Sequence, residues 1–462
     1  MQAVWSERRK FESWRRIWLA LAEAQAEMGL GVTPAQLAAM RGALTMNEGD
    51  FHRAAMHEKR LRHDVMAHVH AFGEAAPAAA GIIHLGMTSQ DVNCNAETPI
   101  VKEALHLVCI KMARLIVDLG EFAGRWSSTP CLGLTHFQPA QPTTVGKRAA
   151  SWGSDLALCL ERLERTRDAL PLRGLKGATG TQASFLALFD GDGAKVLELE
   201  RRFVQKLGWT GPLLACTGQT YPRVADAFVV GDLATAAAAC SKLCNDVRLL
   251  SGRKELDEPF EKSQIGSSAM PYKRNPMRCE RATGLCRFVI SLASSGYDTA
   301  AAQWLERTLD DSSNRRLVLP EAFLALDGVL DTLHGVCAGL VVHEKSAMKN
   351  LMEELPFLAT ENIMMEGVRK GGDRQALHEA IRTHAQVAGL RVKQEGLPND
   401  LLERLKAEPL LRGVDLSGVL APERYLGLAP AQALRYAREI AGPIGARYRA
   451  ELDRLEPAES AV

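Results

Sequence analysis

The chain has 462 residues, a formal net charge of +1, 47% hydrophobic residues and 24% charged residues. This length exceeds what one compact core usually holds and predicts about three domains of ordinary globular composition. The near-neutral charge argues against binding to nucleic acid or to an anionic membrane, and we find no apolar run of roughly 20 residues and no signal-like start. The ten cysteines contain no Cys-x-x-Cys pair, so we expect a cytoplasmic protein with neither a zinc site nor a disulfide framework.

Apolar residues recur with helical spacing along most of the chain. Phe11, Trp14, Trp18 and Leu21 mark one helix face, and we expect that helix to stop before Gly29. A second face follows near residues 105–119. Strand-like alternation is scarce and aromatic residues make up only 6% of the chain. These patterns predict an all-α fold.

We expect three helical domains, at residues 1–88, 89–342 and 343–462. Glycines and the Thr88-Ser89 pair interrupt the pattern at the first boundary, and shorter amphipathic helices follow the second. Residues 224–250 are rich in Ala and Val and almost uncharged in the middle. A helix that is apolar all round is buried on all sides, which predicts a central bundle of long helices.

Residues 266–276 form the most informative segment, Gly-Ser-Ser-Ala-Met-Pro-Tyr-Lys-Arg-Asn-Pro. Pro271 and Pro276 lack the backbone donor and restrict the preceding residue, so the segment is predicted to be a loop. Two hydroxyls and two cations in one loop suit anion binding or a nucleophile or base. From composition alone, a solvated basic turn is an equal alternative.

This loop resembles the signature of the fumarase/aspartase superfamily of lyases, and four other segments resemble the adenylosuccinate lyase family within it. These segments are residues 62–70, 135–141, 180–185 and 306–312. The resemblance runs from about Lys10 to the last helices. It implies a mostly helical homotetramer built on a central bundle of long helices, with active sites shared between subunits and no cofactor.

The resemblance also implies the reaction. Such amidine-lyase type enzymes of purine nucleotide biosynthesis eliminate fumarate from adenylosuccinate, giving AMP, and from SAICAR, giving AICAR. A β-elimination of this kind needs a base, a general acid, donors that stabilise a carbanion next to a carboxylate, and here a phosphate site.

The resemblance assigns the base to Ser267. A serine hydroxyl is too weak an acid to act unaided, so Lys273, Arg274 or main-chain N–H groups of the turn must stabilise the alkoxide. Ser268 is the less favoured substitute. On the residues alone, both serines are equally well explained as turn formers.

The resemblance assigns the acid to His136, whose ordinary pKa near 6.5 suits proton donation near neutral pH. Pro139 makes a helix through this histidine improbable. Glu280 matches the family carboxylate that pairs with the histidine, where it would fix the tautomer and raise the pKa. By sequence alone, Glu280 reads as a surface helix carboxylate between Arg278 and Arg281.

Three histidines lie within eight residues, at His63, His68 and His70. Their spacing is not a recognised zinc pattern, so we expect no metal. The resemblance assigns Arg62, His63 and Asp64 to substrate binding, with His63 near the leaving amine and the phosphate. His68 and His70 are expected to be structural.

Hydroxyl, amide and ammonium donors suit the two carboxylates of a succinyl group. The residues that match the family's carboxylate-binding positions are Thr88, Ser89, Thr135, Gln219, Lys273 and Asn275. The residues that match its phosphate site are Arg307, Ser312 and Arg316, with Arg281 nearby. The phosphate residues converge only if the stretch between them turns, and a helix N-cap at Asp311 or Ser312 is an alternative explanation of part of this motif.

A weak glycine motif is formed by Gly174, Gly177 and Gly180, and no strand clearly precedes it. We therefore expect a loop beside the substrate whose backbone needs the freedom of glycine, and we do not expect an NAD site. In related enzymes an Arg-Tyr pair contacts the phosphate, and the matching position would lie upstream of Met1. Either the start of the protein lies further upstream, or Arg307, Ser312 and Arg316 hold the phosphate without that pair. We therefore expect a higher KM for this chain than for one extended by that segment.

The sequence leaves two alternative functions. Another lyase of the superfamily, such as an argininosuccinate lyase, would lack the phosphate cluster. A catalytically inactive oligomeric scaffold would have lost catalytic groups, and Ser267, Lys273, His136 and Glu280 are all present.

Overall fold

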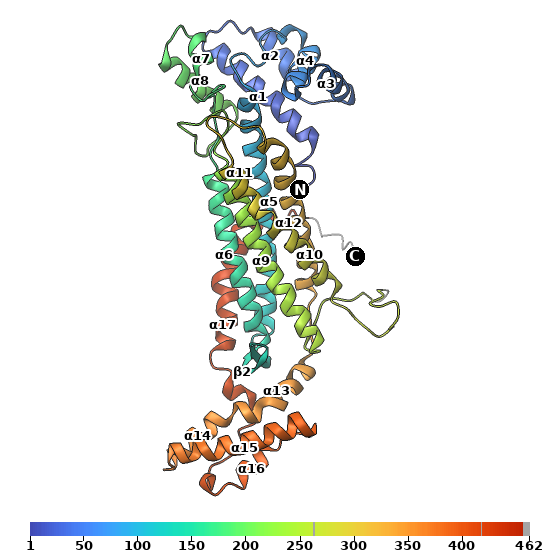
Figure 1. The fold of residues 1–462 in the computed structure, drawn as a ribbon, viewed down its shortest axis with the longest axis vertical. Coiled ribbons are helices and arrows are strands. Elements are labelled where there is room, and N and C mark those ends of the chain that lie inside the picture. The colour runs from blue at the N-terminus through green and yellow to red at the C-terminus, as the bar shows by residue number, and fades with distance from the viewer. Residues whose placement is uncertain (262–263, 417, 456–462) are drawn as a thin grey trace. The chain divides into compact units, whose positions relative to one another are not determined.

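The computed structural model describes residues 1–261, 264–416 and 418–455, and these are predominantly helical (Figure 1). This confirms the predicted all-α fold class. The chain forms two compact units, each built from three separate segments. Unit 1 comprises Met1–Lys111, Leu158–Ala238 and Gly284–Leu330, and unit 2 comprises Met112–Ala157, Ala239–Thr283 and Asp331–Val462. The division into three domains stays a prediction, although its borders coincide with the start of α5 at Ser89 and the end of β4 at Val342.

Five long helices contribute residues to both units. They are α5 (Ser89–Arg125), α6 (Val145–Ala169), α9 (Val224–Gly252), α10 (Met277–Ser291) and α12 (Asp311–Ala338). The predicted helix over residues 224–250 is confirmed as α9. Contrary to the sequence analysis, α9 is long and apolar enough to cross a membrane by length and composition, alone among the described residues. In the most apolar 18-residue stretch of α9, 56% is buried inside the protein, and the inner helix of a bundle shows the same combination of apolar composition and burial.

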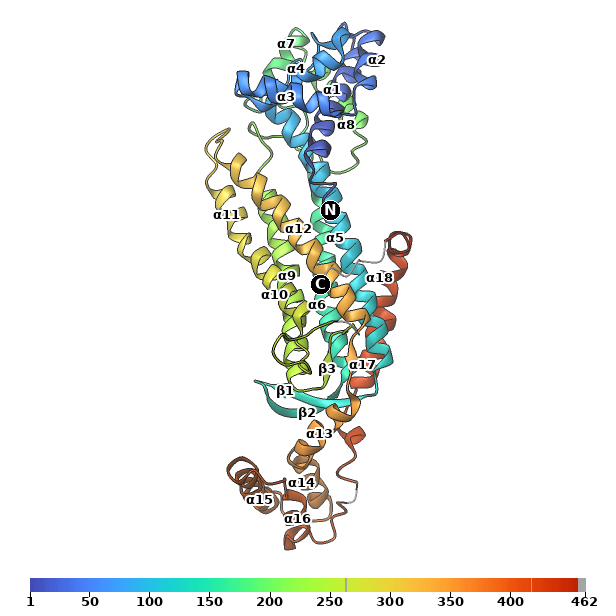
Figure 2. The ribbon, with the colours of Figure 1, turned by 90° about the vertical axis from the view of Figure 1, so that its right-hand side faces the viewer.

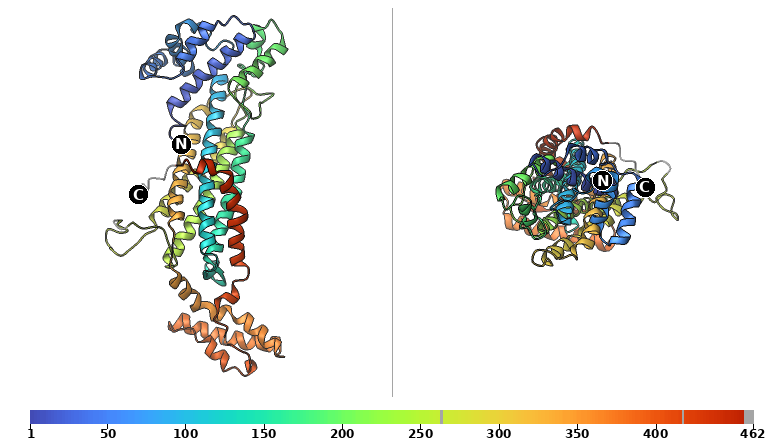
Figure 3. Two further views of the ribbon diagram at one scale, coloured as in Figure 1. Left: turned by 180° about the vertical axis from the view of Figure 1, so that it is seen from behind. Right: turned by 90° about the horizontal axis from the view of Figure 1, so that it is seen from above.

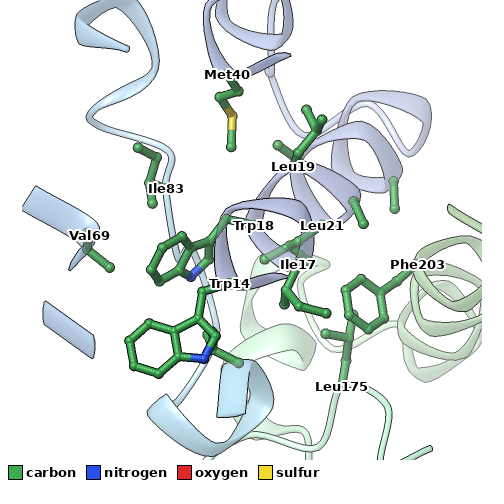
Figure 4. Packing of buried hydrophobic residues seen from close by; sticks show 14 of the residues in the cluster. Trp14, Ile17, Trp18, Leu19, Leu21, Met40, Val69, Ile83, Leu175 and Phe203 are labelled. Atoms are coloured by element: carbon green, nitrogen blue, oxygen red, sulfur yellow. The ribbon is translucent and has the colours of Figure 1, made fainter. Parts of the chain in front are cut away.

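The N-terminal helices of unit 1 pack around two tryptophans. The other helices of this unit are α1 (Glu7–Glu27), α2 (Pro34–Gly42), α3 (Glu48–Leu61), α4 (Asp64–Ala75), the 3-10 turn Pro77–Ala79, α7 (Ala183–Leu188), α8 (Gly193–Lys206) and α11 (Ala293–Ala301). Trp14 and Trp18 on α1 are each 1% exposed and meet edge to face, with Phe203 of α8 in the same core (Figure 4). The predicted apolar face of the first helix is therefore confirmed, and the helix ends before Gly29 as expected.

Unit 2 contains a β-hairpin and a separate helical cluster near the C-terminus. Strands β1 (Pro130–Thr135) and β2 (Gln138–Thr144) pair antiparallel, and so do β3 (Leu256–Asp257) and β4 (Val341–Val342) (Figure 2). The helices of the C-terminal cluster are α13 (Glu344–Leu358), α14 (Thr360–Arg369), α15 (Arg374–Glu395) and α16 (Leu401–Lys406), followed by 3-10 turns at Pro409–Leu411 and Pro422–Tyr425. Leu377, Ile381 and Leu405 belong to the core of this cluster.

The last helices of unit 2 lie beside the long helices. They are α17 (Ala429–Tyr436), a π-helical turn (Ala437–Ala441), α18 (Gly442–Arg447) and α19 (Arg449–Leu452). The hydroxyl of Tyr436 donates to the Ile116 carbonyl of α5 at 3.1 Å, and Figure 3 shows the red C-terminal helices beside this part of the chain. Gly153 of α6 makes room for that ring, because an added Cβ would lie 1.8 Å from the Tyr436 hydroxyl.

The hairpin was not predicted. Its second strand contains Pro139 and Pro142, which remove ladder donors, and its turn lacks the usual glycine. A two-stranded sheet tolerates these prolines because each strand has a free edge. The pairing register of β1 and β2 shifts between Leu132 and Gly133. The two strands approach so closely there that a Cβ on Gly133 would lie 2.2 Å from the Gln141 carbonyl oxygen.

Candidate active site

The signature loop in unit 2 is closed by contacts between its two ends. The side-chain amide of Asn275 donates to the Gly266 carbonyl at 2.8 Å. A Cβ on Gly266 would lie 2.2 Å from the Lys273 carbonyl oxygen, so glycine is required here by close backbone approach. The segment is a loop that leads into α10, as predicted. Asn275 therefore closes the loop through its side chain.

Ser267 accepts two backbone hydrogen bonds inside this loop. The N–H groups of Ala269 and Met270 donate to Ser267 Oγ at 3.3 and 3.1 Å. Ser267 thus stabilises a turn, as expected if the serines of this loop are turn formers. The same two donors also point at the oxygen that would carry the charge of an alkoxide, so the two interpretations are compatible.

The cations of the loop differ in their surroundings. The guanidinium of Arg274 lies over the Phe260 ring at 5.0 Å. Lys273 is exposed, and its ammonium has no hydrogen bond or ion pair within the described part of the chain. Lys273 is therefore the loop cation available to a ligand.

His136 stands at the tip of the hairpin. Thr135 pairs with Gln138, so His136 and Phe137 form a two-residue loop with φ values of 52° and 58°. Positive φ at both positions is characteristic of a type I′ turn, which usually contains Asn and Gly. Thr135, His136 and Phe137 are all exposed in the single chain.

Glu280 lies on α10 with half of its side chain exposed, and its carboxylate is 3.8 Å from Arg248 of α9. No contact with His136 is described within one chain. Arg281, the next residue, is also exposed. The predicted pairing of Glu280 with His136 stays a prediction.

In unit 1 the structure brings two pairs of predicted residues together. His63 caps α4, where its Nδ1 accepts from the Met66 N–H at 3.3 Å, and its Nε2 lies 3.4 Å from Ser89 Oγ. The carboxylate of Asp64 accepts from Arg316 at 2.9 Å. These contacts join the start of α4 to the starts of α5 and α12.

Two features refine this part of the site. Burial opposes ionisation of Asp64, but the Val65 N–H and the nearby Arg316 outweigh it and hold the pKa of Asp64 below its usual value. Arg62 ends α3 with a φ of 55° and is exposed. Within the described part of the chain, Arg62 forms no hydrogen bond or ion pair with the other predicted residues.

Unit 1 contains a cavity of about 280 Å³ that the predicted phosphate residues share. Arg307, Ser312 and Arg316 all line it, because the chain turns between Arg307 and the start of α12 at Asp311. Three further cations line the same cavity and were missed by sequence reasoning: Lys10, Arg223 and Arg315. These three residues come from different helices and loops, so no local sequence motif unites them.

A network of buried and partly buried carboxylates holds these arginines. Asp311 accepts from Arg307 at 2.8 and 2.9 Å and from Arg223 at 2.6 Å, so its side chain binds arginines and does not serve as a helix cap. Arg315 donates to Asp226 at 2.6 Å and to Glu97 at 2.7 Å. Burial lowers the pKa of Arg315, but these two carboxylates outweigh burial and raise it well above its usual value.

Asp91 fastens the glycine-rich loop to the start of α5. Its carboxylate accepts from the N–H of Thr88 at 2.8 Å and from the N–H groups of Lys176 and Gly177 at 3.0 and 3.1 Å, and it also binds the buried Arg173. Neither Asp91 nor Arg173 was anticipated.

The loop itself has the predicted backbone freedom. Gly174, Gly177 and Gly180 have φ values of 79°, 73° and 85°, which favour glycine. Gln219 Nε2 donates to the Ala178 carbonyl at 2.9 Å, which places this predicted carboxylate-binding residue on the loop.

The other two histidines of the first motif have different surroundings. His68 is buried and stacks on Phe11 with ring centroids 3.8 Å apart, and burial lowers its pKa to about 4. His70 is exposed and stacks on His57 at 5.2 Å. Within the described residues, no group of three or more His, Cys, Asp or Glu side chains is arranged to hold a metal ion.

Comparisons with known proteins extend over nearly the whole chain. Residues 2–291 match a family model described as lyase, and residues 356–436 match one described as adenylosuccinate lyase C-terminus. The chain is 47% identical over 442 residues to the adenylosuccinate lyase of Saccharomyces cerevisiae, covering 95% of this chain and 92% of that protein. It is 46% identical over 435 residues to that of Schizosaccharomyces pombe, covering 94% and 90%.

Solved structures share the fold. A fumarate lyase from Mesorhizobium sp. BNC1 superposes with a TM-score of 0.81 at 24% identity, covering 95% of this chain and 97% of that one. The 3-carboxy-cis,cis-muconate lactonizing enzyme from Pseudomonas putida gives a TM-score of 0.83 at 24% identity, covering 96% and 97%. The chain belongs to the adenylosuccinate lyase family and is a carbon–nitrogen lyase.

Proposed function

We propose that this protein cleaves adenylosuccinate to AMP and fumarate, and cleaves SAICAR to AICAR and fumarate, in purine nucleotide biosynthesis. The observation that supports this proposal best is the presence of a cationic cavity beside residues that match the family's nucleotide site, in a chain 47% identical to an adenylosuccinate lyase. A phosphate-bearing substrate suits such a cavity, whereas an argininosuccinate-type substrate has no phosphate to place there.

Ser267 acts as the base in this proposal. Its hydroxyl first gives its own proton to solvent, and the N–H groups of Ala269 and Met270 stabilise the resulting alkoxide. The alkoxide then takes the carbon-bound proton next to a succinyl carboxylate. Lys273 and Asn275 from the same loop, with Thr88, Ser89, Thr135 and Gln219, donate to the carboxylates as negative charge develops.

His136 then protonates the nitrogen as the carbon–nitrogen bond breaks, and the electron pair of that bond passes to the nitrogen. Glu280 orients the imidazole. His63, held by its contacts with Met66 and Ser89, lies at the leaving-amine end with Arg62 and Asp64. Arg307, Ser312 and Arg316 bind the phosphate, with Arg281 beside the nucleotide. No cofactor or metal enters the reaction.

The working form is a homotetramer with active sites shared between subunits, located in the cytoplasm. Catalysis of this kind needs donors in a site that excludes water, yet His136 and Lys273 are exposed in the single chain. The long helices also expose large apolar side chains that a second copy would cover, including Phe228 and Leu249 on α9, Phe288 on α10 and Leu317 on α12.

The test is ultraviolet absorbance of the purified protein with adenylosuccinate, with the Ser267→Ala variant beside it. We expect AMP and fumarate to form with the wild type and not with the variant. Equal rates for the two proteins would refute Ser267 as the base, and no turnover by a folded wild type would refute the reaction.

Shared sites have a separate test. Ser267→Ala and His136→Ala variants, each inactive, are mixed, dissociated and reassembled. If sites combine residues from different subunits, the mixed oligomers regain part of the activity. Mixed oligomers that are proven by mass spectrometry but stay inactive would contradict this arrangement.

A further inference from the structure

The cavity in unit 1 contains a cation that no carboxylate neutralises directly. Five side chains lining it are cationic and two, Glu7 and Glu97, are carboxylates. Each of the four arginines is bound by at least one carboxylate: Arg223 and Arg307 by Asp311, Arg315 by Asp226, and Arg316 by Asp64. Lys10, on α1, differs from them. Within the described residues its ammonium forms no hydrogen bond and no ion pair.

The ammonium of Lys10 has aromatic rings and charged groups of both signs near it. Its Nζ lies 5.2 Å from the centroid of the Phe11 ring and 5.1 Å from that of Trp14, and Trp14 also lines the cavity. Burial and the nearby charge of Arg316 lower the pKa of Lys10, and together they outweigh the carboxylates of Asp64, Glu97 and Glu7, which raise it. An ammonium that is partly desolvated, lacks a bonded anion and borders a cavity gains strongly from an anionic ligand.

We propose that Lys10 is a further ligand of the substrate phosphate and acts together with Arg307, Ser312 and Arg316. The proposal rests on the proposed function. The reason is geometric, since Lys10 lines the same cavity as those three residues and its three N–H donors are unused. A phosphate monoester dianion supplies the directly bonded, charged acceptors that the Lys10 ammonium lacks within the described residues.

Two variants and a matched control test this assignment. Lys10→Met keeps the buried stem and removes the charge, and Lys10→Gln serves as a second variant should the first fail to fold. Lys102→Met is the control, because Lys102 is also half-buried in unit 1 with its ammonium over a ring, 4.6 Å from the centroid of Trp209, and does not line the cavity. AMP and adenosine are the probes, measured by calorimetry with each protein.

Loss of one charge-assisted contact corresponds to roughly a 10- to 100-fold weaker affinity. We therefore expect AMP to bind Lys10→Met and Lys10→Gln about 10-fold or more weakly than wild type, while adenosine binds all proteins equally and Lys102→Met behaves as wild type. Equal AMP affinities of wild type and both Lys10 variants would overturn the role of Lys10 and leave the proposed reaction standing. A wild type that neither binds AMP nor releases fumarate would overturn both.

Discussion

Asp91 gives the sharpest prediction about what holds the site together. Its carboxylate is fully buried and receives donors from Thr88, Lys176, Gly177 and Arg173. Asp91→Asn keeps the shape but removes the charge, and its amide presents hydrogens toward groups that are themselves donors. The guanidinium of Arg173 is then buried without an anion.

Breaking a buried pair by removing one partner costs about 3–5 kcal/mol. We therefore expect Asp91→Asn to unfold at a clearly lower urea concentration than wild type. Tryptophan fluorescence reports this unfolding, because Trp14 and Trp18 lie in the core of the same unit. Asp168→Asn is the control. That carboxylate is 62% exposed beside Arg167 and its loss should cost no more than about 1 kcal/mol.

A second substitution separates charge burial from simple disruption. If the cost of Asp91→Asn comes from the uncompensated guanidinium, then adding Arg173→Met should recover part of the lost stability. The reasoning would be refuted by an Asp91→Asn protein within about 1 kcal/mol of wild type, or by a double variant whose losses simply add.

Three further predictions concern the loop at residues 266–276, the stability of the protein at acid pH, and the binding of Arg307 by Asp311, which we call the arginine clamp. Gly266→Ala places a methyl against the Lys273 carbonyl and should abolish most activity without unfolding the protein, whereas Gly284→Ala, with open space around it, should leave kcat unchanged in the same assay. Burial lowers the pKa of His68 to about 4, so between about pH 6.5 and about pH 4 the unfolded chain takes up a proton that the folded protein does not, and stability falls as the pH decreases. His68→Phe should reduce that loss in thermal melts, and His70→Phe should not. Asp311→Asn frees the guanidinium of Arg307 and should raise KM for adenylosuccinate more than it lowers kcat; an unchanged KM would refute the clamp.

The sequence predicted the elements whose signals are local. The apolar face around Trp14, the long Ala-rich α9 and the loop around Pro271 and Pro276 each follow from the spacing or backbone chemistry of nearby residues. The sequence also predicted that Arg307 and Arg316 converge if the chain turns between them, and the turn before α12 meets this condition.

What the sequence did not predict depends on contacts between distant segments. Lys10 and Arg315 become neighbours of one cavity only through folding, and Asp91 is identified by donors that lie more than 80 positions away in the chain. The hairpin was missed for a different reason. Its prolines and its His136-Phe137 turn contradict local strand and turn preferences, so only tertiary context explains it.

The turn at His136 and Phe137 has a consequence for the order in which the protein folds. Left-handed backbone at a residue other than glycine costs roughly 1–2 kcal/mol, so this turn opposes the hairpin that contains it. A hairpin whose turn carries this cost is a poor folding nucleus, so we infer that β1 and β2 form after the helices around them. We therefore expect pulsed hydrogen exchange to protect the amides of β1 and β2 after those of α5 and α6. Replacing Phe137 with glycine should advance that protection while changing nothing in the helices.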